Sequence, residues 1–458
     1  MRVIVIGAGK LGYEIARLLS EEDHDIVVID NHPDALAEVA NNLDVLTLEG
    51  NGASPAVLAK AQVDKTDLLI AAAGSDEVNM VACLAAKRLG VPVCAARVRD
   101  PDYAVDEPDI SCRLLGIDVL IDSERTAAIE IARILKTPNA TQVDYFANGR
   151  VSVIRVRVDE GAPVTRGPLK EIRPERCVIA VVVRGDDLFI PDGDTVIQPD
   201  DRMYIVTHTG QFAAIRELTG VDDRRPLREV AIVGGGRVGL ALAQMLLKNR
   251  RRAPEVKIIE RNYERCTELA AALDNALVIC GDGEKLEVLE EEMVGRSDAF
   301  VAVTSDDGTN LLSTLAAKDL GVPEAVVRLS REDYIPLAER AGADAAVVPR
   351  LITASTVLKL VRQHPIVSVA LLEDGRAQAV ELVVEEGAPA AGKTLADLRG
   401  LDGAVVGAVM RHDKVVVPGG ETEIRAGDRL VLFGMTATLP KVQELFRRGN
   451  FKRPNKMR

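Results

Sequence analysis

The sequence has few of the residues on which several classes of protein depend. It contains no Trp, and aromatic residues make up 3% of its 458 positions, so its cores must be built from Val, Ile, Leu and Ala. No apolar run approaches the roughly 18 residues that a membrane-spanning helix needs. Its five His residues share no spacing and its six Cys residues form no C-x-x-C pair, which argues against a metal centre or a redox motif. We expect the cysteines to be reduced and mostly buried; they are Cys83, Cys94, Cys112, Cys177, Cys266 and Cys280.

The charge balance is acidic. With 57 Lys and Arg against 70 Asp and Glu, the net charge is −13. A protein that binds nucleic acid needs a basic face, so no nucleic-acid partner is expected. The basic tail at residues 449–458 is the local exception, and it is either a solvated terminus or a contact for an anionic lipid or an acidic partner. A predicted strand begins at residue 3, which leaves no room for a signal peptide and favours a cytoplasmic protein.

What the sequence does contain is one motif, twice. An apolar strand runs into G-x-G-x-x-G and then into an Ala- and Leu-rich helix, at residues 7–12 and again at residues 234–239. In that context the glycines predict a dinucleotide cradle, because they allow a tight turn, close approach of a pyrophosphate and close helix packing. The alternative is a vestigial site that keeps only its turn. The predicted cradle residues are Gly7, Ala8, Gly9, Lys10, Leu11 and Gly12 in one half, and Gly234, Gly235, Gly236, Arg237, Val238 and Gly239 in the other.

An acid ends the second predicted strand of each half. Asp30 and Glu260 lie about 20 residues beyond their glycines, where a carboxylate accepts hydrogen bonds from the ribose hydroxyls of an adenosine. The same negative charge would repel a 2′-phosphate. The sequence therefore predicts two sites for NAD(H) rather than NADP.

Other candidate site residues lie at the ends of later strands. Asn51 and Asp282 follow the third strand of each half, and Ala73 and Thr304 follow the fourth. Ligands of open α/β sheets bind at such ends, and a plain loop is the alternative. Arg97 and Arg328 end the fifth strand. Each Arg either pairs with a phosphate or braces an acid across the interface between units.

Two acids stand at the start of the following helix in each half. They are Asp76, Glu77, Asp306 and Asp307. Paired carboxylates there suit acid–base chemistry or a cation, but the simpler interpretation is that they are N-cap and first-turn acids, which the helix dipole favours. The segments Ser75–Asn79 and Ser305–Asn310 align with one residue added in the second.

The fold class expected is α/β. Short apolar strands that alternate with helical stretches predict two Rossmann-like domains with parallel sheets, each followed by a small α+β module. The helix predicted over 124–135 is a candidate crossover or dimerisation element, exposed after the last strand. The predicted order is 1–123 (first Rossmann-like domain), 124–140 (connecting helix), 141–220 (first small module), 229–348 (second Rossmann-like domain), 349–363 (connecting helix), 364–448 (second small module) and 449–458 (basic tail).

The sequence resembles a known family, the TrkA regulators of bacterial Trk potassium uptake, which are built from tandem RCK (regulator of potassium conductance) domains. The matching stretches are Gly7–Gly12, Ser75–Met80, Ala96–Tyr103 and Glu160–Pro163. The stretches Asp-Glu-x-Asn-Met and Arg-Asp-Pro-Asp-Tyr are much more specific than the glycines. The resemblance covers residues 1 to about 448.

The resemblance implies a regulatory subunit that gates potassium flux. Such a subunit is cytoplasmic and docks, at the inner face of the cell membrane, on a potassium-translocating subunit of the TrkH/TrkG type. It forms homo-oligomeric rings, and it binds NAD(H) and also ATP or ADP. The implied nucleotide contacts are Gly7 to Leu11, Asp30, Asn51, Ala73 and Arg97 in the first half, and Gly234 to Val238, Glu260, Asp282, Thr304 and Arg328 in the second. Ala73 and Ser330 depart from the pattern, which bears on whether both clefts prefer one nucleotide.

Two alternatives accompany this hypothesis. A bifunctional NAD-dependent oxidoreductase would need an acid–base group and a substrate pocket beside the nicotinamide. The small modules contain no recurring Ser/His/Asp or Lys/His/Glu grouping, so no enzyme is expected. A ligand-free oligomeric scaffold is the other alternative.

Overall fold

Apolar runs rich in Val and Ile build the first parallel sheet. Its strands are β1 (Arg2–Ile6), β2 (Asp25–Asp30), β3 (Leu46–Glu49), β4 (Leu68–Ala71), β5 (Val93–Arg97) and β6 (Val119–Ile121). They pair in the order β3-β2-β1-β4-β5-β6, all parallel. The helices of this unit are α1 (Lys10–Ser20), α2 (Pro33–Asn42), α3 (Pro55–Lys60) and α4 (Asp76–Arg88). From β1 the next strands are added on one side (β2, β3), and from β4 they are added on the other (β5, β6). Ligands bind at such a point of reversal in open α/β sheets.

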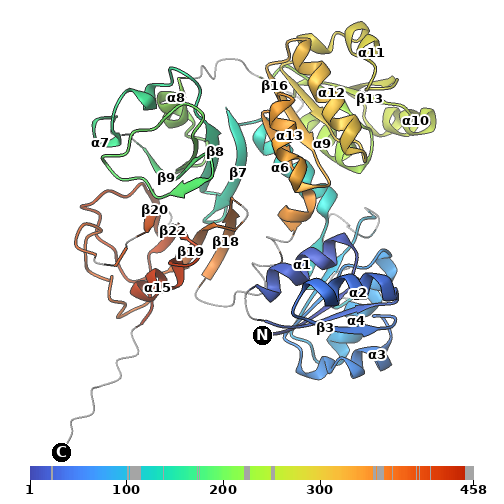
Figure 1. Ribbon diagram of the computed structural model, residues 1–458, viewed down its shortest axis with the longest axis horizontal. Helices are drawn as coiled ribbons and strands as arrows, with labels where there is room; N and C mark the ends of the chain where they lie inside the picture. The colour runs from blue at the N-terminus through green and yellow to red at the C-terminus, as the bar shows by residue number, and fades with distance from the viewer. Residues whose placement is uncertain are drawn as a thin grey trace, which may run out of the picture.

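The computed structural model describes residues 1–21, 24–100, 103, 115–137, 139–172, 174, 176–220, 227–248, 253–353, 357, 366–373, 375–398, 400–401, 403–412 and 414–448. Figure 1 shows two larger units and, beside them, two smaller modules that lie against each other. Within these residues, no helix is both long and apolar enough to cross a membrane.

The second unit repeats the first. Its strands are β12 (Glu229–Val233), β13 (Glu255–Glu260), β14 (Ala276–Cys280), β15 (Ala299–Ala302), β16 (Glu324–Arg328) and β17 (Ala345–Val347). The order β14-β13-β12-β15-β16-β17 is that of the first sheet. Its helices are α9 (Arg237–Leu247), α10 (Tyr263–Ala272), α11 (Leu286–Glu291), α12 (Asp307–Asp319) and α13 (Ile335–Arg340). The predicted pair of Rossmann-like parallel sheets is confirmed.

The small modules contain antiparallel sheets with a shared topology. The first has β7 (Ala140–Phe146), β8 (Val151–Arg157), β9 (Cys177–Arg184), β10 (Asp187–Phe189) and β11 (Arg202–His208), ordered β10-β9-β11-β8-β7. The second has β18 (Ile366–Leu372), β19 (Ala377–Val383), β20 (Ala404–Arg411), β21 (Lys414–Val416) and β22 (Arg429–Met435), ordered β18-β19-β22-β20-β21. Each module ends in a helix, α8 (Ala213–Thr219) or α15 (Leu439–Gln443). Strand β7 was not predicted, because its buried residues are three apart rather than two.

The connecting helix α6 (Ser123–Ile134) is buried, so the prediction that it is exposed is wrong. Its residues Ala127, Ala128 and Ile131 lie in one apolar cluster with Leu242 and Leu246 of α9. Its apolar stripe was visible in the sequence, but the helix that covers the stripe is more than a hundred residues further along the chain. The helix that leaves the first unit thus packs on the second.

The other connecting segment packs in the reverse direction. Residues 349–353 and Val357 are helical, and the rest of the helix predicted over 349–363 lies outside the described residues. Val357 lies in the apolar cluster of the first unit with Ile15 and Leu19 of α1. The two nucleotide units are therefore coupled by helices that they exchange.

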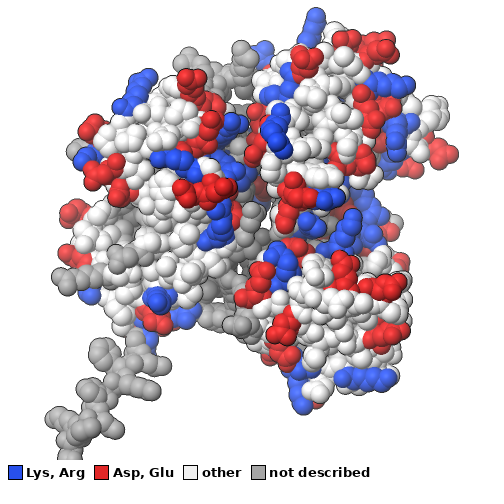
Figure 2. Space-filling model, viewed as in Figure 1, with Lys and Arg blue, Asp and Glu red and all other residues white. Residues whose placement is uncertain are grey.

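The two small modules pack against each other through their sheets. Val151 and Tyr204 of the first module share an apolar cluster with Leu372 and Phe433 of the second. At the edge of this cluster the carboxylate of Glu373 accepts a hydrogen bond from the Tyr204 hydroxyl at 2.8 Å. Acidic and basic side chains are interspersed over the visible face of the units (Figure 2).

Candidate functional site

The first and third glycines of each motif are required by the backbone. Gly7 has φ +99° and Gly234 has φ +107°, in the left-handed region that favours glycine. A Cβ on Gly12 would lie 1.8 Å from the Gly7 carbonyl oxygen, and one on Gly239 would lie 2.0 Å from that of Gly234. Each helix thus begins pressed against its own turn.

The second glycine faces open space. A Cβ on Gly9 or Gly236 would meet no described atom within 4 Å. Both residues have ordinary backbone angles, so the fold itself does not require glycine there. The N-termini of α1 and α9 are open at this point, where the amide groups of a helix attract an anion.

The strand-end acids are tied to the glycine loops. Asp30 accepts hydrogen bonds from the amides of Ala8 at 2.6 Å and His32 at 2.8 Å. Glu260 accepts from Gly235 at 2.8 Å and Asn262 at 2.9 Å. The carboxylates are therefore fixed beside the loop that would hold a pyrophosphate.

Asp30 is poised to remain ionised. Partial burial is the largest single effect and raises its pKa, but the amides of Ala8 and His32 and the His32 side chain act together in the opposite direction and hold the pKa below its ordinary value. The His32 ring also lies 3.0 Å from the Asp30 carboxylate. The sequence did not single out His32, because it does not recur in the second half.

In each unit one buried asparagine, on α4 or α12, binds the end of the fourth strand. Asn79 accepts from the Ala73 amide at 2.8 Å and donates to the carbonyls of Ala73 and Arg97. Asn310 makes the same bonds to Thr304 and Arg328, and it also accepts from the Thr304 hydroxyl at 2.7 Å. These residues hold neighbouring strand ends together, and sequence reasoning assigned them no role although both lie in the repeated segment.

Arg97 and Arg328, the last residues of β5 and β16, lie beside these strand ends. Arg97 lies 4.0 Å from Glu124 of α6, and Arg328 donates to the Thr304 carbonyl at 2.8 Å. The Nε atoms of both are buried without a hydrogen-bond partner in the described part of the chain. Burial lowers the pKa of Arg97, Glu124 opposes this, and the nearby charges of Arg99 and Arg237 lower it further. Since Glu124 belongs to α6, which packs on α9, Arg97 lies beside the helix that joins the two units.

The residues at the starts of α4 and α12 have two different roles. Ser75 and Asp306 are the N-caps, accepting hydrogen bonds from the amides of Val78 and Thr309. Asp76 instead accepts from the Arg99 amide, and Asp307 from the Ser330 amide, both at 2.8 Å. Asp306 is thus an N-cap, and Asp76, Glu77 and Asp307 are acids of the first turn, as predicted. In addition, Asp76 and Asp307 tie the loop after the fifth strand to the helix.

This correspondence also corrects the alignment of the two halves. Ser75 matches Asp306 by position and role, so the residue added between Ser75–Asn79 and Ser305–Asn310 is not needed. No group of three or more metal-ligating side chains lies within the described residues.

The turns after the third strands use their own side chains. Asn51 accepts from the Ala53 amide at 2.9 Å, and Asp282 accepts from the Glu284 amide at 3.2 Å. Such bonds stabilise the local turn. The structure brings the glycine loop, the acid, the fourth strand end and the arginine to one edge of each sheet, with these turns beside them.

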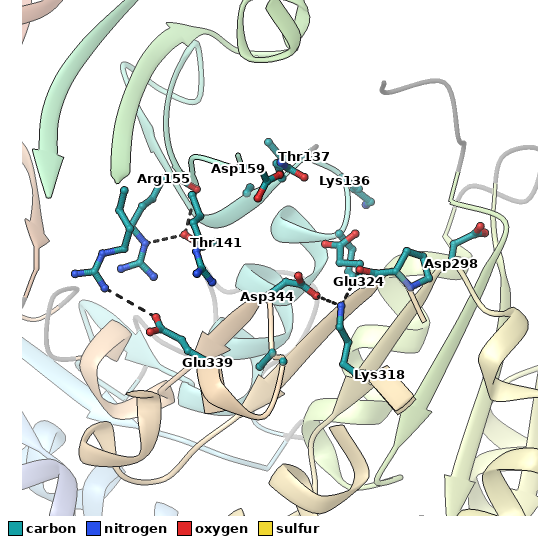
Figure 3. A pocket seen from close by; sticks show the side chains of 18 of the residues that line it. Lys136, Thr137, Thr141, Arg155, Asp159, Asp298, Lys318, Glu324, Glu339 and Asp344 are labelled. Atoms are coloured by element: carbon teal, nitrogen blue, oxygen red, sulfur yellow. Dashed lines mark hydrogen bonds and ion pairs between the residues drawn. The ribbon is translucent and has the colours of Figure 1, made fainter. Parts of the chain in front are cut away.

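A separate cavity of about 1890 Å³ lies between the opposite edge of the second sheet and the first small module. Figure 3 shows charged side chains converging on it, among them Lys318, which lies 3.0 Å from Asp344. Burial raises the pKa of Glu324 to about 8, the charge of Asp344 adds to the increase, and Lys318 opposes it. This cavity could not be predicted from the sequence, because its walls come from different domains.

The sequence matches two domain families, each twice. The TrkA-N domain matches residues 3–123 and 230–349. The TrkA-C domain matches residues 153–220 and 379–447. Together these matches cover most of the chain and alternate along it.

Proteins similar over their whole length carry the same description. The chain is 36% identical to the Trk system potassium uptake protein TrkA homolog 2 of Methanosarcina mazei, covering 98% of this chain and all of that one. It is 36% identical to Trk system potassium uptake protein TrkA of Azorhizobium caulinodans, covering 98% and 99%. The fold resembles that of the GsuK channel bound to NAD, with a TM-score of 0.61 at 23% identity over 97% of this chain and 78% of the channel. The chain therefore belongs to the TrkA family of Trk potassium uptake proteins.

Proposed function

We propose that this protein is a regulatory, nucleotide-binding subunit that gates a potassium uptake channel or transporter in the membrane. The observation that carries the proposal is the pair of nucleotide cradles, each with a glycine turn, an open second glycine and a fixed acid. The relatives' description as potassium uptake proteins supports it. The role is regulatory rather than catalytic, since neither cleft sets an acid–base pair beside a substrate pocket in the described residues.

NAD(H) is the first ligand that we propose, with ATP or ADP as further ligands. Asp30 and Glu260 would accept hydrogen bonds from ribose hydroxyls, and the amides of residues 9–11 and 236–238 would hold the phosphates. Asn51, Ala73, Asp282 and Thr304 would border the ligand, and Arg97 and Arg328 would face its charge. The NAD-bound channel of similar fold supports this choice of cofactor.

Gating would follow from the coupling of the two units. Arg97 of the first cleft lies 4.0 Å from Glu124 of α6, and α6 packs on α9 of the second unit. A nucleotide that binds one arrangement of the units better than the other shifts the balance by that difference in affinity. The protein would act at the cytoplasmic face of the membrane, in a homo-oligomeric ring bound to a subunit of the TrkH/TrkG type. The domain boundaries at residues 123, 140, 220, 348 and 363 stay predictions.

Calorimetry and flux measurements test the proposal together. The purified chain should bind NAD(H) or an adenine nucleotide at two sites, Asp30→Arg should remove one site, and Glu260→Arg the other. Potassium flux through the reconstituted complex should respond to the same nucleotides, and the response should weaken in each variant. A chain that binds neither class of nucleotide, or flux that ignores both variants, would sink the proposal.

A further inference from the structure

Two thiols meet beside the acid of the second cleft. Cys266 lies on α10, and its Sγ donates to the Glu260 carbonyl oxygen at 3.2 Å. The Gly281 amide donates to the same oxygen at 3.0 Å. Cys280 is the last residue of β14 and stands opposite Glu260 in the parallel register. The hydrogen bonds thus hold Cys266 against the end of the strand that carries Cys280.

The thiols differ in access to solvent. Cys280 is exposed, whereas Cys266 is 8% exposed. Burial raises the pKa of Cys266 to about 11, and its interaction with the Cys280 thiol adds to the increase. Since the thiolate is the reactive form, Cys266 is protected near neutral pH and Cys280 is the thiol that a reagent meets first.

The first unit has no thiol at these positions. Glu49 pairs with Asp30 as Cys280 pairs with Glu260, and Leu36 occupies the place of Cys266 on α2. The chain has another close pair, Cys83 and Cys94, in which both residues are fully buried. That pair is a control for proximity without access.

We propose that Cys266 and Cys280 are a modification site that exchanges with low-molecular-weight disulfides to form a reversible intramolecular disulfide. The Cys280 thiolate attacks the reagent RSSR, forming Cys280–S–SR and releasing one thiolate, which takes up a proton. Cys266 then loses its proton and attacks the Cys280 sulfur, and the second RS⁻ leaves and is protonated. Two protein thiols are oxidised and one RSSR is reduced to two RSH. In a reducing cytosol such a bond is transient, as expected of a regulatory disulfide.

The disulfide would act on the second cleft alone. It removes Cys266 from the Glu260 carbonyl and ties α10 to β14 next to the ribose-binding acid. This consequence rests on the proposed function, because it needs a nucleotide in that cleft. The chemistry of the thiols does not depend on the proposed function.

The modification is tested on the native full-length chain with glutathione disulfide. Peptide mapping should find a Cys266–Cys280 bond that dithiothreitol reverses, while Cys83 and Cys94 react only after unfolding. Cys280→Ser should abolish the reaction at this site, and Cys266→Ser should stop it at the mixed disulfide. A wild-type chain that stays reduced, or that accumulates only the mixed disulfide on Cys280, overturns the site.

A binding measurement tests the regulation separately. In the Asp30→Arg variant, which leaves only the second cleft, oxidation should change nucleotide affinity at least about fivefold, the lower end of common coupling effects. Adding Cys280→Ser should abolish that change. An unchanged affinity after complete oxidation rejects the regulation. If the disulfide forms in a chain that binds no nucleotide before or after oxidation, the proposed function fails and the modification site stands.

Discussion

The two nucleotide units share their backbone framework and differ in the side chains placed on it. In both, a strand-end acid accepts from the glycine loop, and a buried Asn joins the fourth and fifth strands. These bonds connect main-chain atoms, so they fix the framework whatever the ligand. The shared part therefore concerns the fold of the cleft.

The differences lie where a ligand would meet side chains. Arg99 stands in the first unit where Ser330 stands in the second, and Ala73 stands where Thr304 stands. The first cleft thus has an additional cation, and the second an additional hydroxyl. Duplicated clefts on one framework can in this way serve different nucleotides.

The largest effect is expected from the third glycine of either unit. Gly12→Ala and Gly239→Ala place a Cβ within 2.0 Å of a backbone carbonyl oxygen. Each should lower the free energy of unfolding by at least about 3 kcal/mol, because backbone must move. Urea denaturation measures this. The matched variants Gly9→Ala and Gly236→Ala meet no described atom, so they should keep stability and lose only nucleotide affinity. Equal stability in both sets would refute the assigned roles.

The buried asparagines should give the next largest effect. Asn79→Leu and Asn310→Leu each leave an amide and two carbonyls without their partner. Loss of such buried bonds should cost about 2–3 kcal/mol in the free energy of unfolding. Asn310 should cost less, since the Thr304 carbonyl still accepts from Arg328 at 2.8 Å and the Thr304 hydroxyl can still donate to the Asp306 carbonyl at 3.1 Å. A second unit more sensitive than the first would contradict this difference.

The comparison of sequence with structure follows the same division. The glycine turns, the acids and the order of strands could be predicted, because each depends on residues close together in the chain. The roles of Asn79 and Asp76 could not, since both bind main-chain atoms of the loop around residues 97–100. The helix that packs on α6 could not be predicted either, because an apolar stripe does not show which part of the chain will cover it. The nucleotide contacts themselves remain a prediction.

A smaller effect distinguishes the opposite edges of the two sheets. Glu324 begins β16 where Val93 begins β5, and only Glu324 titrates. Its pKa rises from an ordinary value near 4.5 to about 8 on folding, so between these pH values the unfolded chain has lost a proton that the folded chain keeps. Stability is therefore complete below about pH 4.5 and falls as the pH rises to 8.

The variant Glu324→Gln should remove this loss. Because the side chain is only partly buried, we expect the variant to be about 1–2 kcal/mol more stable than the parent at pH 8.5, and equal to it near pH 4.5. Thermal unfolding across this range measures the difference. Val93→Ile, at the matching position of the first unit, should change the stability by the same amount at both ends of this pH range. A constant difference between Glu324→Gln and the parent would show that Glu324 does not carry the pH dependence.

The smallest effect concerns the preference of the clefts for charge. The Arg99 guanidinium lies 3.3 Å from Asp76, and its charge acts on Arg97. It should favour ATP over ADP in the first cleft, while the second, with Ser330, should discriminate less. In the Glu260→Arg background, Arg99→Ser should lower the ATP/ADP affinity ratio up to about fivefold, the range of a partly exposed ion pair.

The reciprocal exchange sharpens this last comparison. Ser330→Arg in the Asp30→Arg background should raise the ATP/ADP ratio of the second cleft, and both effects should weaken at high salt, because exposed charges are screened. Calorimetry with both nucleotides at two salt concentrations measures them. If Arg99→Ser instead weakens ATP and ADP equally at every salt concentration, Arg99 acts through the loop that Asp76 holds. The difference between the clefts then comes from the ordering of this loop, and the charge of residue 99 does not interact with a phosphate.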